Sequence, residues 1–264
     1  MSFTFIKKTL NLLPAFLPFI CLAGIVILQA QEYKQSVQKL NRVNYLSQEQ
    51  EQAKLIEFQK ETPLLGFDNM AADWSYLNFV QYFGDRHARE TIGYKLVPNY
   101  FETISQLDPR FTQAYLRLSI ANSMYAGYPE QTITLMEQVL ASVEPDSEQA
   151  ALLWTSKGLD ELLFLGDKEA AIKSYKIAAK WAALEPSIPD SLTIKDLETS
   201  LKSTDEIDLK EAQIRAWSSV LVYIKDNQRS QEIVAKINRL QAEVLTLEQK
   251  AKLPAQSITP PAKE

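Results

Sequence analysis

The sequence has few of the residues that catalytic and metal sites use most often. Its 264 residues include one histidine, one cysteine and seven glycines. One His and one Cys leave almost no material for a Ser-His or Cys-His dyad or for a zinc site. The glycines are scattered and form neither a P-loop nor a GxGxxG motif. We therefore expect a protein that is not an enzyme, with no catalytic residues, no cofactor and no metal ion.

The low glycine content and the negative net charge each disfavour further classes, the first of folds and the second of binding partners. All-β and doubly wound folds use glycine in tight turns and phosphate loops, so seven glycines favour an all-α chain. The formal net charge of -5 disfavours electrostatic attraction to nucleic acid. The lone cysteine, Cys21, excludes an internal disulfide. An acidic, all-helical protein that does not bind nucleic acid is expected.

The longest apolar run lies near the N-terminus. Residues 12–28 are all apolar, and we predict a short tail over 1–9 followed by a transmembrane anchor over 10–30. A helix of this length reaches roughly 30 Å, the thickness of a bilayer core. A cleaved signal peptide is the alternative, disfavoured because Leu28 stands where the cleavage site needs a small residue.

The positive charges before and after the predicted anchor are nearly equal in number, so they barely favour one orientation in the membrane over the other. Lys7 and Lys8 precede it, whereas Lys34, Lys39 and Arg42 follow it. A very short N-terminal tail usually stays in the cytoplasm. We therefore expect a single-pass membrane protein whose large domain is periplasmic or lumenal, and the cytoplasmic face stays open as the alternative.

Two further segments flank the predicted domain. Residues 31–62 are rich in Gln and Glu and end before Pro63, so a polar helical stalk and a solvated linker both fit. Residues 254–264 contain three prolines and are expected to be a disordered tail.

The stretch 68–83 is predicted to be an aromatic helix. Asp68 can cap its start and Gly84 can end it. Its aromatic side chains are spread around the helix, which predicts burial on more than one side. Three of them are candidate partner-binding residues: Trp74, Tyr76 and Tyr82.

From this helix onward the chain repeats itself loosely. Pro109, Pro145 and Pro186 follow an acidic residue at intervals of 36 and 41 residues, in the range of a helical-pair repeat. Each interval holds two amphipathic stretches separated by a glycine-bearing turn: 114–125 with 130–142, and 150–165 with 168–183.

The clearest repeat contains GDKEAAIKSYKIAAKWA, residues 166–182. Ala171 and Ala178, seven apart, lie on one helix face and allow a second helix to approach closely, with Tyr175 between them. This stretch resembles the second helix of a tetratricopeptide (TPR) repeat, in which a Gly-Asp turn, Ala, an aromatic and Ala occur at this spacing. The resemblance implies an all-α solenoid of helical hairpins behind the anchor.

The resemblance covers residues 66–250, which we interpret as one repeat domain, and it weakens away from the centre. In the preceding hairpin, Thr132 and Val139 stand where the family has alanines. The segment before it fits only with an insertion around His87. A fourth pair is predicted within residues 209–247. In whole-chain layout the sequence is also similar to membrane-anchored TPR proteins of cyanobacteria.

The last predicted helix carries an apolar stripe at steps of three and four residues. This stripe either caps the stack of hairpins or meets another chain as a short coiled coil. Its members are Ile233, Ile237, Leu240, Val244 and Leu247.

By the resemblance, the first helices of successive repeats line a concave face that binds a peptide or helix of a partner protein. Exposed positions on that face would include Arg117, Asn122, Lys157 and Asp160. An ordinary solvated surface is the alternative for these four residues.

Three functional hypotheses follow. The first is a membrane-anchored protein–protein interaction scaffold that recruits, or helps to assemble, a membrane or envelope complex. The second is a permanent structural subunit of a membrane complex, such as a photosynthetic one, with the 68–83 helix as its docking surface. The third, ranked last, is a hydrolase with a Ser-Lys or two-carboxylate site.

Overall fold

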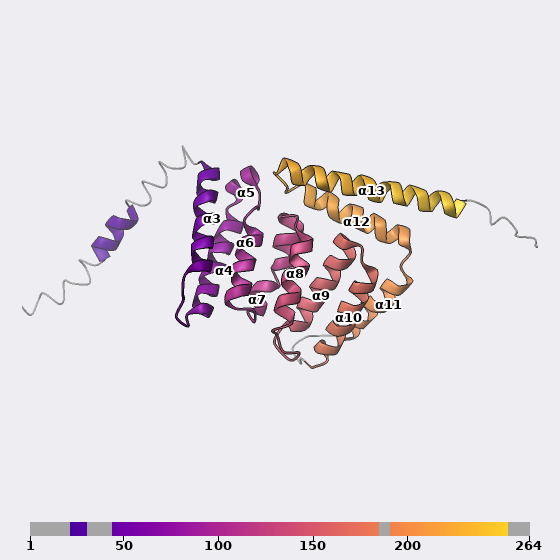
Figure 1. Ribbon diagram of the computed structural model, residues 1–264, viewed down its shortest axis with the longest axis horizontal. Coiled ribbons are helices and arrows are strands. Elements are labelled where there is room, and N and C mark those ends of the chain that lie inside the picture. The colour runs from indigo at the N-terminus through magenta and orange to yellow at the C-terminus, as the bar shows by residue number, and fades with distance from the viewer. Residues whose placement is uncertain (1–21, 31–43, 185–190, 253–264) are drawn as a thin grey trace, which may run out of the picture. The chain divides into compact units, whose positions relative to one another are not determined.

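The computed structural model describes residues 22–30, 44–184 and 191–252. Within these ranges every regular element is a helix and no strand occurs (Figure 1). The prediction of an all-α chain is therefore confirmed.

The chain divides into two compact units, Met1–Ser47 and Gln48–Glu264. In the first unit, residues 22–30 form a helix whose apolar side chains are exposed, Leu22 and Leu28 among them. No helix in the described part of the chain combines the length and apolar character needed to cross a bilayer.

Several predicted segments lie outside the described residues. These are the N-terminal tail 1–9, most of the predicted anchor (10–21), the first part of the stalk or linker (31–43) and the C-terminal tail 254–264.

The second unit consists of consecutive helices joined by short turns. Two segments, η1 and η2, have the wider π-helical hydrogen bonding; η2 directly continues α9. The elements are α3 (Tyr45–Glu61), α4 (Asp68–Gly84), α5 (Arg86–Ile92), α6 (Val97–Leu107), α7 (Thr112–Tyr115), η1 (Ser119–Tyr125), α8 (Pro129–Leu140), α9 (Ala150–Asp160), η2 (Glu161–Leu165), α10 (Lys168–Ala182), α11 (Ser191–Ser203), α12 (Glu206–Leu221) and α13 (Asn227–Lys252).

Aromatic side chains of α4 and α6 meet in a core to which η1 and α8 also contribute. Phe79 of α4 meets Phe101 of α6 edge to face, with ring centroids 4.7 Å apart. Tyr115 and Leu118 are fully buried in the same cluster. Full burial of a side chain of this size contributes roughly 2 kcal/mol. This cluster therefore fixes α4 against α6.

The helices α9 and α10 form the close hairpin that the small residues predicted. Gly166 ends η2 in the left-handed region, and the Asp167 carboxylate caps α10 by accepting from the Ala170 N–H at 2.9 Å. Ala171 and Ala178 are completely buried where α10 meets α9. The predicted close approach of the two helices is confirmed.

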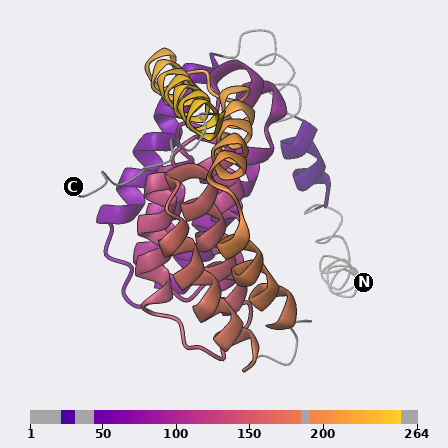
Figure 2. The same ribbon diagram turned by 90° about the vertical axis from the view of Figure 1, so that its right-hand side faces the viewer.

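The C-terminal helices α12 and α13 run side by side (Figures 1 and 2). Ile233, Ile237 and Leu240 of α13 pack with Trp217 of α12 and Phe164 of η2. These three residues of the predicted apolar stripe are therefore buried within their own chain.

The start of α4 differs from prediction by one residue, whereas its end agrees. Asp68 is the first helical residue, and the cap position is held by Phe67, which makes no side-chain cap bond. Gly84 is the last residue of α4, so the helix ends at the predicted glycine. Asp85 follows and caps α5 by accepting from the Ala88 N–H at 3.1 Å.

Candidate functional site

The four residues predicted to face a partner from the repeats separate into one exposed and three buried side chains. Arg117 is exposed. Asn122, Lys157 and Asp160 are 0%, 5% and 1% exposed. The prediction that these three residues are exposed is wrong, because polar groups of neighbouring helices enclose each of them.

Asp160 is held by two serines of η1. Ser119 Oγ donates to Oδ1 and Ser123 Oγ donates to Oδ2, both at 2.8 Å. Beside them, Asn122 Nδ2 donates to Thr132 Oγ1 of α8 at 3.1 Å. Burial raises the pKa of Asp160 to about 7, although the two serine hydrogen bonds oppose the rise. This cluster joins η1, α8 and the end of α9.

Lys157 is the centre of a second buried polar group. Its ammonium pairs with Glu161 one turn further on, and with Glu137 of α8 at 3.3 Å. Ser174 of α10 donates to the other carboxylate oxygen of Glu161 at 2.6 Å. Lys157 therefore links three helices of its own chain and does not present a charge to a partner.

The three aromatic candidates on α4 also differ in exposure. Tyr82 is 2% exposed and donates to Glu49 Oε1 of α3 at 2.8 Å. Tyr76 is half-buried, with its ring 5.3 Å from that of Phe111. Trp74 is 62% exposed. Of the three, only Trp74 is placed to contact another molecule; Tyr76 and Tyr82 belong to the core and its edge.

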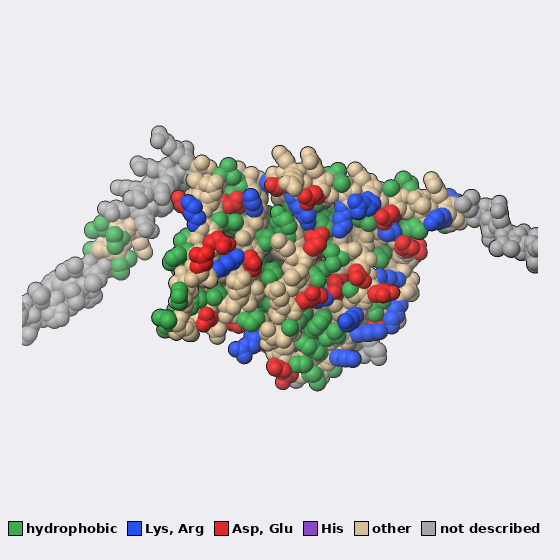
Figure 3. All heavy atoms as spheres, viewed as in Figure 1, with side chains coloured by type: hydrophobic (Ala, Val, Ile, Leu, Met, Phe, Trp, Pro, Cys, Tyr) green, Lys and Arg blue, Asp and Glu red, His purple; other side chains and the backbone are tan. Residues whose placement is uncertain are grey.

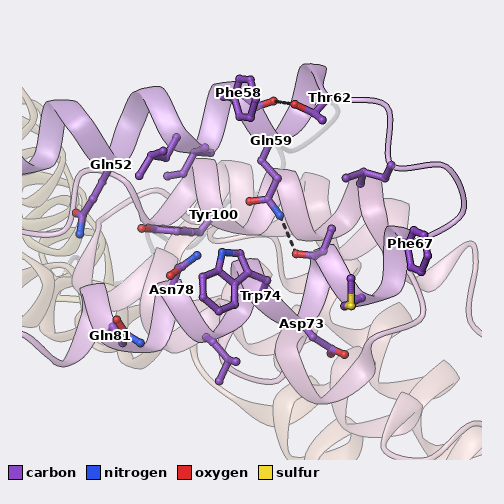
Figure 4. Close-up of a pocket in the computed structure, with 16 residues that line it drawn as sticks. Gln52, Phe58, Gln59, Thr62, Phe67, Asp73, Trp74, Asn78, Gln81 and Tyr100 are labelled. Carbon is purple, nitrogen blue, oxygen red and sulfur yellow. Dashed lines mark hydrogen bonds between the residues drawn. The ribbon is translucent and has the colours of Figure 1, made fainter. Parts of the chain in front are cut away.

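Trp74 stands in the wall of an apolar groove between α3 and α4, shown in Figure 4. The groove has a volume of about 800 Å³ and is lined mainly by hydrophobic side chains. Its principal apolar members are Leu55 and Phe58 of α3, Phe67 of the connecting turn, and Met70, Trp74 and Leu77 of α4.

Long polar side chains hold α3 beside α4. Gln59 Nε2 donates to the Ala71 carbonyl at 2.8 Å, and Gln59 Oε1 accepts from Ser75 Oγ at 2.7 Å. Lys60 pairs with Glu102 of α6 at 2.8 Å. Among the α3 side chains, that of Ile56 is buried in the apolar core. Residues 45–61 are thus a packed helix, attached mostly through polar bridges.

The apolar members of the groove are unusually accessible. Leu55, Phe58, Met70, Trp74 and Leu77 are each between 54% and 68% exposed. Figure 3 shows hydrophobic side chains at the surface on the α3 side of the domain. Contiguous apolar surface of this kind marks an interaction site in many soluble domains. The groove is therefore the best candidate functional site in the described part of the chain.

Among the exposed apolar residues of this groove, only Trp74 was predicted from the sequence as a partner-binding residue. Met70, Trp74 and Leu77 share one helix face at steps of four and three, a signal that was available beside Trp74. Leu55 and Phe58 were missed because their segment is mostly polar and was interpreted as a stalk or linker.

The described residues contain no group of three or more His, Cys, Asp and Glu side chains close enough to hold a metal ion. Comparison with protein-family models, with curated proteins and with solved structures finds no match for this chain.

Proposed function

We propose that this chain is a membrane-anchored protein-binding module that holds a helical segment of another protein in the α3–α4 groove. The observation that carries the proposal is the set of exposed apolar side chains that line the groove on both helices, among them Leu55, Phe58 and Trp74. A helix of a partner that lays its apolar face into such a groove removes this surface from water.

The remaining helices supply a rigid support for the groove in this proposal. The α9–α10 hairpin, with Ala171 and Ala178 buried at its contact, supports a TPR-like solenoid of stacked helical pairs. A stiff framework keeps α4 in one position, so that less conformational entropy is lost when a partner binds.

We further propose that residues 10–30 anchor the protein in a membrane and that the helical domain lies on the periplasmic or lumenal side. The support is the unbroken apolar run 12–28, together with the exposed apolar side chains of residues 22–30. The anchor keeps the groove near its partner and raises the effective concentration of each for the other.

A permanent subunit of a membrane complex is the second candidate. The observation in its favour is the exposure of Phe58, Met70 and Trp74, since large apolar side chains in water promote aggregation unless a partner covers them. Recruitment of a transient partner and permanent assembly use the same groove and differ in the lifetime of the complex.

Recovery of partners from solubilised membranes tests the proposal. We expect the wild-type chain to retain a defined protein partner and the double variant Leu55→Ser, Trp74→Ser to lose it. The control variant Val222→Ser, Leu245→Ser replaces two side chains of similar exposure, one directly after α12 and one on α13. Loss of the partner in the control and retention in the groove variant would rule out the groove. Retention through stringent washing favours the permanent subunit.

A further inference from the structure

The charges around the groove are strongly one-sided. Between residues 48 and 85 the chain has seven carboxylates and two lysines. Lys60 is already paired with Glu102 at 2.8 Å and with Glu57 at 3.3 Å. Lys54 is therefore the one lysine between residues 48 and 85 that is left to balance the exposed carboxylates of this segment.

Two of these carboxylates lie beside the apolar walls. Asp73 lines the groove and is exposed, as Figure 4 shows next to Trp74. Glu51 is exposed on α3, four residues before Leu55 and seven before Phe58, so it shares their helix face. Neither carboxylate has an ion-pair partner among the described residues. Each is free to pair with a cation from outside.

The groove also offers uncommitted amide groups. Gln52 and Asn78 line it and are half-buried, and Gln81 lies at its end. Amide side chains on opposite walls can bond to the polar edge of a bound helix while its apolar face fills the centre.

We infer that the occupant of the groove is a cationic amphipathic helix of a partner protein. This inference rests on the proposed function and specifies its partner. Two or three large apolar side chains of the helix, spaced at i, i+4 and i+7, fill the space between Phe58 and Trp74. Lys or Arg side chains at the edges of that stripe pair with Asp73 and Glu51.

The sign of the charges disfavours the other occupants of an apolar groove. An anionic membrane surface attracts basic segments, and the carboxylates of this rim repel it. An anionic amphiphile meets the same repulsion at Asp73. An acidic or neutral helix gains the apolar contacts but lacks the ion pairs that fix its register and speed its association.

A pair of matched peptides tests the inference on the full chain embedded in phosphatidylcholine nanodiscs. Both probes are synthetic helices with one Leu/Phe stripe at i, i+3, i+4 and i+7; one carries Lys at the flanking positions and the other Glu. We expect the Lys peptide to bind at least tenfold more tightly by fluorescence anisotropy, with a preference that falls as salt is added.

Charge reversal of the rim provides the decisive comparison. In the double variant Glu51→Lys, Asp73→Lys we expect the preference to invert in favour of the Glu peptide. The control Glu144→Lys, Glu169→Lys makes the same change of net charge at exposed positions outside the groove and should keep the wild-type preference. An equal change in both variants would mean that net charge, not the rim, selects the peptide, and would overturn the inference.

The remaining outcomes separate this inference from the proposed function. Equal binding of both peptides, lost in Leu55→Ser, Trp74→Ser, overturns the cationic preference and leaves the groove as a helix-binding site. Binding of neither peptide overturns the inference, and the proposed function is then judged by the recovery of its protein partner from membranes.

Discussion

Tyr175 of α10 lies directly against the Cα of Gly158 in α9. A Cβ placed on Gly158 would be 2.8 Å from Tyr175 Cε1 and 3.0 Å from Cδ1, closer than non-bonded carbon atoms pack. The absence of a side chain at Gly158 therefore permits the contact between α9 and α10, as much as the alanines of α10 do.

Gly158→Ala should consequently destabilise the domain even though alanine favours helices. We expect a loss of about 1–3 kcal/mol in the free energy of unfolding, because the ring of Tyr175 must move within a packed contact. Gly84→Ala is the matched control, since no atom lies within 4 Å of a Cβ there. It should be neutral or slightly stabilising. Urea denaturation of both variants measures the difference; equal midpoints would contradict this account of the hairpin.

Removing the buried charge of Lys157 should lower the stability of the domain more than removing a surface charge does. Lys157→Met leaves the buried Glu161 without its cation, and loss of one partner of a buried ion pair typically costs about 3–5 kcal/mol. Arg86→Met breaks the exposed pair with Glu90, which water screens, and should cost far less stability. Thermal unfolding of the two variants compares them directly, and similar shifts in Tm would show that the buried group is not structural.

The double variant Lys157→Met, Glu161→Gln serves as the control for that prediction. It removes both charges and keeps a side chain that accepts a hydrogen bond from Ser174. We expect it to recover part of the stability lost in Lys157→Met.

Asp160 should make stability depend on pH in a direction opposite to that of an ordinary ion-paired carboxylate. Its pKa rises from an ordinary value of 3.8 to about 7 in the folded protein because it is buried. Between these values the unfolded chain has lost the proton while the folded chain keeps it. The stabilisation from this group is therefore greatest at low pH and decreases as pH rises toward 7, by up to about 4 kcal/mol.

Asp160→Asn removes this titration and keeps groups that can bond to Ser119 and Ser123. We expect the unfolding free energy of the variant, relative to wild type, to increase steadily between pH 4 and pH 7 and to level off above. Chemical denaturation at several pH values measures it. A difference that does not change with pH would show that Asp160 titrates normally.

Gln59→Ala should loosen α3 without unfolding the rest of the domain. The amide of Gln59 bridges the Ala71 carbonyl and Ser75, and the substitution removes both hydrogen bonds. We expect faster hydrogen exchange of the α3 amides and unchanged exchange in α9 and α10. Gln50→Ala, at an exposed position of the same helix, should leave α3 as it is. Uniformly faster exchange across the domain would contradict a local role for Gln59.

The parts of the fold that could be predicted depend on residues close together in sequence. The Gly166-Asp167 turn and the alanines at 171 and 178 are local signals, and the α9–α10 hairpin follows from them. Helical content follows in the same way from spacing and from the low number of glycines.

The buried polar groups could not be predicted because their partners come from distant segments. Asp160 accepts hydrogen bonds from Ser119 and Ser123, which precede it by 41 and 37 residues. An aspartate in a helix is usually exposed, so nothing local in the sequence signals its burial. The α3 wall of the groove was missed for a related reason, since Gln59 and Lys60 attach this polar helix through partners on α4 and α6.

Site-specific photo-crosslinking in intact cells tests the central claim, that the α3–α4 groove binds another protein, most directly. A photoreactive phenylalanine analogue replaces Phe58 or Trp74 in the groove, and Val222, 69% exposed directly after α12, is the control position. We predict one defined protein adduct from positions 58 and 74 and none from position 222. Adducts with lipid alone, or the same protein adduct from all three positions, would contradict the claim.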